Sequence, residues 1–179
     1  MVVIDVDTEQ ASASIQLQGA HITKWVIHGQ PGIIWLSEDA VFAKGKSIRG
    51  GIPVCWPWFG AHKSSASLPA HGFARMVGWE LIETRLKNKS IELVFCLKCS
   101  SDLQAMWPYS TELFYTMSIG EKLELDLHTQ NTGDADINLG EALHSYFNVV
   151  MCEIFSYLAL MGVTTSTNWK ISVESLSQA

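Results

Sequence analysis

Positive charge is scarce in this chain, and charge of either sign is uncommon. Its 179 residues include 12 Lys and Arg against 18 Asp and Glu, so the formal net charge is −6, and only 17% of the residues are charged. A nucleic-acid-binding domain needs a basic surface, so this balance argues against that class of partner. It still allows a small anionic ligand, because two or three well-placed arginines can make a local positive pocket.

Long apolar runs are also lacking. The N-terminus, MVVIDVDTEQ, has neither the basic region nor the apolar stretch of a signal peptide. The most apolar late segment, residues 149–163, is interrupted by Glu153 and is too short to span a bilayer. The sequence therefore predicts a cytoplasmic protein without membrane contact.

Cysteine is sparse as well, with four residues, at positions 55, 96, 99 and 152. The Cys96-x-x-Cys99 spacing is compatible with a metal or redox site. However, it falls in a predicted strand, where positions i and i+3 face opposite sides, and no second pair or histidine cluster completes a zinc set. Buried thiols are the favoured interpretation, and we expect no metal and no cofactor.

What the chain does contain is apolar residues, 47% of the total, arranged with a period of two. Polar and apolar residues alternate along 14–18 and 122–128, and residues 91–97 and 113–119 are rich in aliphatic and aromatic side chains. Gly120-Glu121 predicts a hairpin that joins 113–119 to 122–129. The pattern predicts an all-β, sandwich-like fold in a single domain, 1–179.

The first candidate for chemistry is SIRGGIPVCWPWFG, residues 47–60. Prolines fix φ and glycines allow close backbone approach, so this stretch forms a rigid, irregular wall rather than a plain strand. Aromatic faces suit a sugar ring, and Arg49 beside two glycines can reach a bound anion. An equally weighted alternative places Trp56, Trp58 and Phe59 in the core and leaves Arg49 as a solvated charge.

The second candidate is LPAHGFAR, residues 68–75. His71 and Arg75 lie four residues apart around a glycine, and a loop can direct both into one cleft. Arg75 offers a planar fork for a phosphate or carboxylate. The signal is weak alone, because a histidine and an arginine are common on surfaces.

The third candidate is EALHSYF, residues 141–147. His144 sits in an otherwise apolar, aromatic segment that reads as a strand. A histidine so placed is more often a hydrogen-bonded core residue than a catalyst. If it is functional, an ordinary pKa near neutrality suits it to general acid or base work.

Together, these three stretches in this order resemble the hexose-6-phosphate mutarotase branch of the aldose 1-epimerase family. The similarity includes residues 107–134 and covers roughly residues 5–148, leaving 149–179 as an atypical tail. It implies an antiparallel β-sandwich of the galactose mutarotase type. It also implies an isomerase of carbohydrate metabolism that interconverts the α and β anomers of a hexose 6-phosphate.

The resemblance also implies roles for individual residues. His144 matches the family's catalytic histidine, which is expected to act as the acid at the ring oxygen. Arg49 and Arg75 match arginines that bind the sugar phosphate, and His71 matches a histidine that shapes the sugar site. Many members carry glutamine where this chain has Ala70, so one substrate contact is expected to be missing.

The tail departs from the family pattern. Members are substantially longer, with a catalytic glutamate near the C-terminus and a substrate-binding aspartate before it, whereas this chain ends 35 residues after His144, at Ala179. Residues 169–173 are similar to a later family strand, whereas Glu153 and Glu174 have no family context. We therefore expect a sandwich that is incomplete at its C-terminal end and weak or undetectable turnover. A non-catalytic sugar-phosphate binding module and a degenerate fragment remain the alternatives.

Overall fold

A computed structural model describes residues 1–99, 103–148 and 168–173. Strands account for nearly all of the regular structure in these residues. In chain order the elements are β1 (Val3–Asp7), β2 (Ala11–Gln16), β3 (His21–Ile27), β4 (Val54–Cys55), the 3₁₀ helix η1 (Ala74–Met76), β5 (Glu80–Leu86), β6 (Ile91–Lys98), β7 (Thr111–Ile119), β8 (Leu123–Asn131), β9 (Ala142–Leu143) and β10 (Asn168–Val173).

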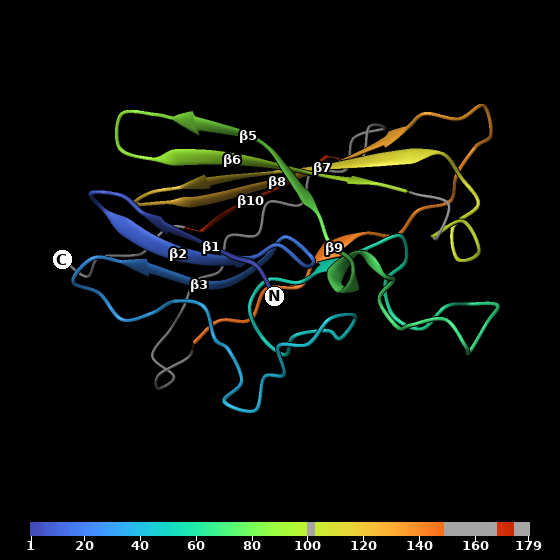
Figure 1. The fold of residues 1–179 in the computed structure, drawn as a ribbon, viewed down its shortest axis with the longest axis horizontal. Helices are drawn as coiled ribbons and strands as arrows, with labels where there is room; N and C mark the ends of the chain where they lie inside the picture. The colour runs from blue at the N-terminus through green and yellow to red at the C-terminus, as the bar shows by residue number, and fades with distance from the viewer. Residues whose placement is uncertain (100–102, 149–167, 174–179) are drawn as a thin grey trace.

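The strands form two larger antiparallel sheets and a small third one. The order is β1-β2-β3 in the first sheet and β10-β8-β7-β6-β5 in the second, and β4 pairs with β9 alone. Figure 1 shows the three-stranded sheet in blue below the five-stranded sheet, with β9 near the middle of the view and the long connections between β3 and β5 along its lower side. The predicted all-β sandwich is confirmed.

The predicted hairpin is formed by β7 and β8. Their register runs from Thr111 opposite Asn131 to Ile119 opposite Leu123, so the turn begins at Gly120. Along β7 every second side chain is buried, which is the burial pattern expected when one face of a strand meets a core. The period-two alternation in the sequence therefore identifies which face of this sheet is buried.

The two larger sheets share one hydrophobic core. It includes Ile15 and Trp25 from the first sheet and Tyr115 and Leu125 from the second, all fully buried. The Trp25 indole N–H donates to the Gly120 carbonyl over 3.3 Å, which ties β3 to the β7–β8 turn. This core supports β4 and β9, on which the candidate site is built.

One edge of the five-stranded sheet is β5. A bulge lies between Leu81 and Glu83, where the register with β6 shifts by one residue. Arg85 pairs with Glu83 and Glu92. The hydrogen bonds that Glu92 accepts from Lys87 and from Arg85 hold the pKa of its carboxyl below the usual range. A bulge and a charged surface are common ways to keep an edge strand from pairing with another chain.

The remaining predictions can be compared with the described residues. Cys55 and Cys96 are buried, Cys99 is partly buried, and burial raises the pKa of all three thiols, as expected of inert cysteines. Residues 169–173 form a strand within β10, as predicted, and β10 pairs with β8. The apolar segment 149–163 lies outside the described residues. Within the ranges described here, no helix has the length and apolar character needed to cross a membrane.

Candidate functional site

The three predicted stretches meet around β4. On one side β4 pairs with β9, with Val54 opposite Leu143 and Cys55 opposite Ala142. On the other side, the next residue, Trp56, forms a parallel bridge to Gly72. The segments around Gly72 and Ala142, about 70 residues apart in sequence, therefore lie on the two sides of β4.

A sharp turn at His71 and Gly72 brings the second stretch against the first. Both residues have left-handed backbones, with φ of 64° and 71°. A Cβ atom on Gly72 would lie 1.8 Å from the Trp56 carbonyl oxygen, so only glycine fits there. The His71 N–H donates to Gly60 O over 2.7 Å and the Phe73 N–H to Trp56 O over 3.0 Å. This turn fixes the position of the His71 ring.

The environment of His71 selects its proton-bearing nitrogen. The Gly60 N–H donates to Nδ1 over 3.2 Å, so the neutral ring carries its own proton on Nε2. Partial burial, then the charge of Arg75 and then His144, lower the pKa of His71. His71 is therefore a neutral ring that offers an N–H donor.

His144 follows β9 directly, and two aromatic rings stack against its ring. The Tyr146 ring is near-parallel at 4.7 Å between centroids and the Phe59 ring at 6.2 Å. The His71 ring stands perpendicular to it at 6.1 Å. The His144 N–H donates to Pro53 O over 3.1 Å, which anchors its backbone. Aromatic contacts therefore hold the imidazole of this partly buried residue.

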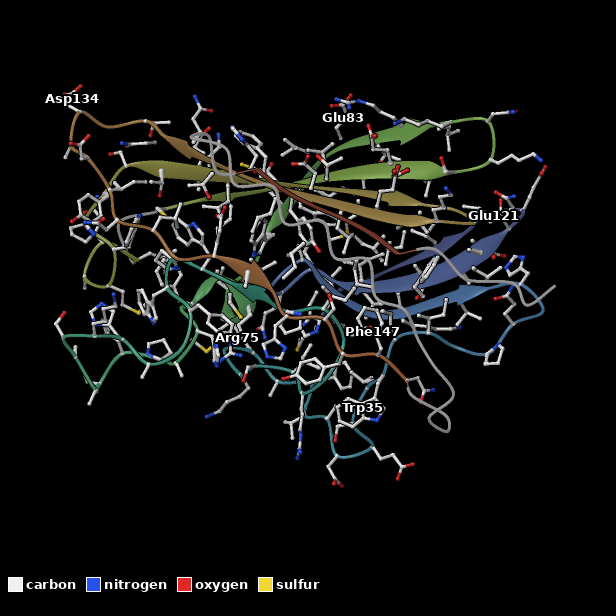
Figure 2. The ribbon with its side chains drawn as sticks, turned by 180° about the vertical axis from the view of Figure 1, so that it is seen from behind. Trp35, Arg75, Glu83, Glu121, Asp134 and Phe147 are labelled. Carbon is white, nitrogen blue, oxygen red and sulfur yellow. The ribbon has the colours of Figure 1, made fainter. Side chains whose placement is uncertain are left out.

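Arg75 lies in η1 and supplies the positive charge of this region. One Nη donates to the Ala70 carbonyl over 2.6 Å, and within the described part of the chain the buried Nε has no partner. Its charge also contributes to lowering the pKa of His71 and of the buried His21. Figure 2 shows Arg75 on the same side of the two large sheets as Trp35 and Phe147. The site therefore has one cation next to two histidine rings.

Arg49 is not brought into contact with these groups. Its side chain is exposed, and among the residues described above it forms no hydrogen bond or ion pair. Only its carbonyl is engaged, accepting from the Ser37 N–H over 3.2 Å. Of the four predicted site residues, the structure brings together His71, His144 and Arg75, and leaves Arg49 as a free cation at the end of a loop.

Sequence reasoning missed the residues that support His144. Tyr146 covers one face of its ring, and Trp35 lies against Tyr146 at 5.9 Å. Phe59 had been an equal candidate for the core, yet its side chain is 54% exposed, whereas Trp56 is fully buried. A signal was available for Tyr146, because residues i and i+2 of an extended segment share a face. None was available for Trp35.

Two further features are separate from this cluster. Within the described ranges, no three His, Cys, Asp or Glu side chains lie close enough to hold a metal ion. An open hollow of about 480 Å³ is lined by Leu17, Lys44 and Met76 among others, but by none of the four predicted site residues. The chemistry of the His71–His144 pair, rather than the size of that hollow, identifies the candidate site.

Comparison with known proteins gives a consistent result. Residues 2–159 match the family model described as aldose 1-epimerase. The chain is 40% identical over 146 residues to an Escherichia coli (strain K12) protein named "Putative glucose-6-phosphate 1-epimerase", and the match covers 82% of this chain and 48% of that protein. It therefore spans about half the length of this relative.

Solved structures agree with the sequence match. A "putative mutarotase" from Salmonella typhimurium superposes with a TM-score of 0.77 at 37% identity, covering 82% of this chain and 48% of the other. A galactose mutarotase related enzyme from Lactobacillus acidophilus superposes with a TM-score of 0.66 at 20% identity, over 84% of this chain and 50% of that one. The second likeness concerns the fold alone.

Proposed function

The chain belongs to the aldose 1-epimerase family, and from that membership we propose that it interconverts the α and β anomers of a hexose 6-phosphate. One observation supports the proposal most strongly. Two histidine rings, His71 and His144, lie 6.1 Å apart at perpendicular angles, and Arg75 is near enough to influence the pKa of His71. One titratable histidine for proton transfer, a second histidine that can donate a hydrogen bond and a fixed cation for the phosphate suit a reaction on a phosphorylated sugar.

The reaction needs proton transfer at two oxygens bound to the same carbon. An acid protonates the ring oxygen while a base removes the proton of the anomeric hydroxyl, and the bond between the anomeric carbon and the ring oxygen breaks. Rotation about the first carbon–carbon bond exposes the other carbonyl face, and the roles then reverse to close the ring. His144 is the acid at the ring oxygen, as its match to the family's catalytic histidine implies, and the stacked Tyr146 and Phe59 rings hold its imidazole in place.

The other predicted residues bind the substrate. His71 donates a hydrogen bond from Nε2 to a sugar hydroxyl, since its Nδ1 is occupied by the Gly60 N–H. Arg75 binds the phosphate with the guanidinium N–H groups that Ala70 leaves unused. Arg49 is an exposed, unengaged cation that supplies further positive charge, as its match to the family motif implies.

The expected turnover depends on the second proton-transfer group, the base that removes the proton of the anomeric hydroxyl. Within the described residues no carboxylate forms a hydrogen bond or ion pair with the His144 ring, and the side chain of Glu141 accepts from Thr129 Oγ1 over 2.8 Å. Glu153 and Glu174 lie outside the described residues. With water or buffer as the base, we expect turnover about 10²–10⁴-fold below that of an enzyme with both groups.

Magnetisation-transfer NMR on glucose 6-phosphate tests this proposal. The purified chain should accelerate exchange between the anomers above the buffer rate, and His144→Ala should return it to that rate. His28→Ala is the matched control, because His28 is an exposed histidine that interacts with Asp7 and Glu9, far in sequence from the site. Equal exchange in wild type and His144→Ala would refute the role of His144. An exchange rate equal to that of an enzyme with both proton-transfer groups would contradict the expectation that the second group is lacking.

A second candidate function is binding of a sugar phosphate without turnover. The absence of a carboxylate at His144 among the described residues favours it. A ligand that binds only the native state raises its stability, so glucose 6-phosphate should raise the melting temperature even when no exchange is seen. A chain that shows neither effect would be a fragment without a specific ligand.

A further inference from the structure

His21, in β3, is a fully buried histidine with one hydrogen bond. Its Nε2 lies 2.8 Å from the Gly50 carbonyl oxygen, and its side chain has no exposed surface. A carbonyl only accepts, so the ring carries its proton on Nε2. Within the described part of the chain its Nδ1 is buried without a partner.

Such a residue is unfavourable for a core taken by itself. An unpaired buried ring nitrogen costs free energy that leucine or valine at the same place would not. Burial keeps this ring neutral by lowering its pKa to about 4. A polar side chain retained in the core therefore calls for a role beyond packing.

The segment that His21 holds has little freedom to move. Gly50 and Gly51 both have left-handed backbones, with φ of 97° and 71°. A Cβ atom on Gly51 would lie 2.4 Å from His21 Nε2 and equally close to the Ile22 carbonyl oxygen. The Gly50–Gly51 backbone therefore lies directly against the imidazole. The hydrogen bond from His21 Nε2 to the Gly50 carbonyl holds this backbone at a fixed distance from β3.

The same backbone carries the support of the candidate site on its other side. The Gly51 carbonyl accepts from the Tyr146 N–H over 3.0 Å, and the Gly51 N–H donates to Trp35 O over 2.7 Å. The Tyr146 ring in turn lies on the His144 ring, with 4.7 Å between centroids. A continuous series of contacts thus runs from His21 through Gly51 and Tyr146 to His144.

We propose that His21 is a positioning residue, which sets the orientation of the His144 ring through the Gly50–Gly51 backbone and Tyr146. It does not touch the substrate. Its consequence for the reaction depends on the proposed function, but its effect on the geometry of His144 does not.

A pair of substitutions separates this role from packing. In His21→Gln the side-chain amide nitrogen occupies the place of Nε2 and can donate to Gly50. In His21→Asn the amide is one methylene shorter and does not reach it. The two variants share their chemistry, so a difference between them reports the hydrogen bond.

The first measurement is the NMR signal of the His144 ring, assigned by its loss in His144→Gln. The stacked Tyr146 and Phe59 rings displace its proton shifts by ring currents, so any rotation of the His144 ring moves them. We expect His21→Gln to keep the wild-type shifts and His21→Asn to change them, while the exposed His28 stays constant in both. Wild-type shifts in the Asn variant, or altered shifts in the Gln variant, would overturn the proposal.

The second measurement is turnover, if the chain proves active. We expect His21→Asn to lower kcat by about 10–100-fold with KM little changed, since misplacing a catalytic group by about 1 Å costs up to 10²-fold. His21→Gln should retain kcat. A chain without activity would contradict the proposed function only, because the ring shifts still decide the role of His21.

If neither variant folds, the unmutated chain decides. A long-range proton–nitrogen spectrum identifies which nitrogen of His21 carries the proton. The proposal requires Nε2, with slow exchange against solvent. A proton on Nδ1, or rapid exchange at Nε2, would overturn it.

Discussion

Replacing Gly72 with alanine should separate the two stretches that carry Trp56 and His71. The new Cβ atom would lie 1.8 Å from the Trp56 carbonyl oxygen and 2.2 Å from its carbon. These are backbone atoms of a fully buried residue, so neither a rotamer change nor a small shift relieves the overlap. The backbones must therefore move apart, and the bridge between Trp56 and Gly72 breaks.

The cost can be worked out from the bonds that this movement removes. Alanine in a left-handed conformation costs roughly 1–2 kcal/mol, and its lower unfolded-state entropy offsets about 0.4–1 kcal/mol of that. Trp56 O also loses the donors Phe73 N and Ala74 N, at 3.0 and 3.3 Å. A buried carbonyl left without a donor costs about 1–3 kcal/mol. These contributions sum to an expected loss in unfolding free energy of roughly 1–5 kcal/mol.

Urea denaturation measures this loss, and Gly60→Ala is the matched control. Gly60 has a φ of 80°, close to the 71° of Gly72, but nothing lies within 4 Å of its Cβ position. It should therefore show only the conformational part, about 1 kcal/mol or less. Equal losses in the two variants would refute the reasoning that the close approach to Trp56, rather than the sign of φ, decides the stability.

Three further predictions concern charge and ring packing. Between pH 7 and pH 4 the wild type should lose roughly 3 kcal/mol more unfolding free energy than His21→Gln. The reason is that unfolded histidine takes up a proton near pH 6.5, while the pKa of buried His21 is about 4. Urea denaturation that gives the same pH dependence for both proteins would contradict this. Arg75→Ala should weaken glucose 6-phosphate binding, measured by calorimetry, about 10–100-fold and reduce the salt dependence of the affinity. Arg85→Ala on β5 should change neither the affinity nor its salt dependence. Undiminished salt dependence in Arg75→Ala would show that the role assigned to Arg75 is wrong. Phe59→Ala should lower the unfolding free energy by no more than about 0.5–1 kcal/mol, since the side chain is 54% exposed. It should nevertheless shift the NMR signals of the His144 ring. Unchanged signals would show that Phe59 is not part of the site.

The strands could be predicted where one face meets the core. In β7 and β8 the buried positions are every second residue, so alternation in the sequence marks them. β5 was missed for two reasons. The bulge at Ile82 shifts which side chains face the same way along the strand, and nearly all of its side chains are exposed. β4 and β9 have two residues each, which is too short for any period.

The site was predicted mainly through resemblance, and local pattern alone would have misassigned it. A histidine in an apolar strand is most often a hydrogen-bonded core residue, and that description fits His21, not His144. Contacts such as Tyr146 with Trp35 join segments about 110 residues apart, and no local pattern reports them. Arg49 shows the limit of resemblance, because a motif match does not place a side chain.

The central claim is that the three stretches form one site for a hexose phosphate. Titrating glucose 6-phosphate into the chain with labelled histidines tests it most directly, independent of catalysis. The account predicts that the His71 and His144 ring signals shift together and saturate at one concentration, while those of His28 do not move. Shifts of His28 equal to those of the pair, or no shifts at all, would contradict it.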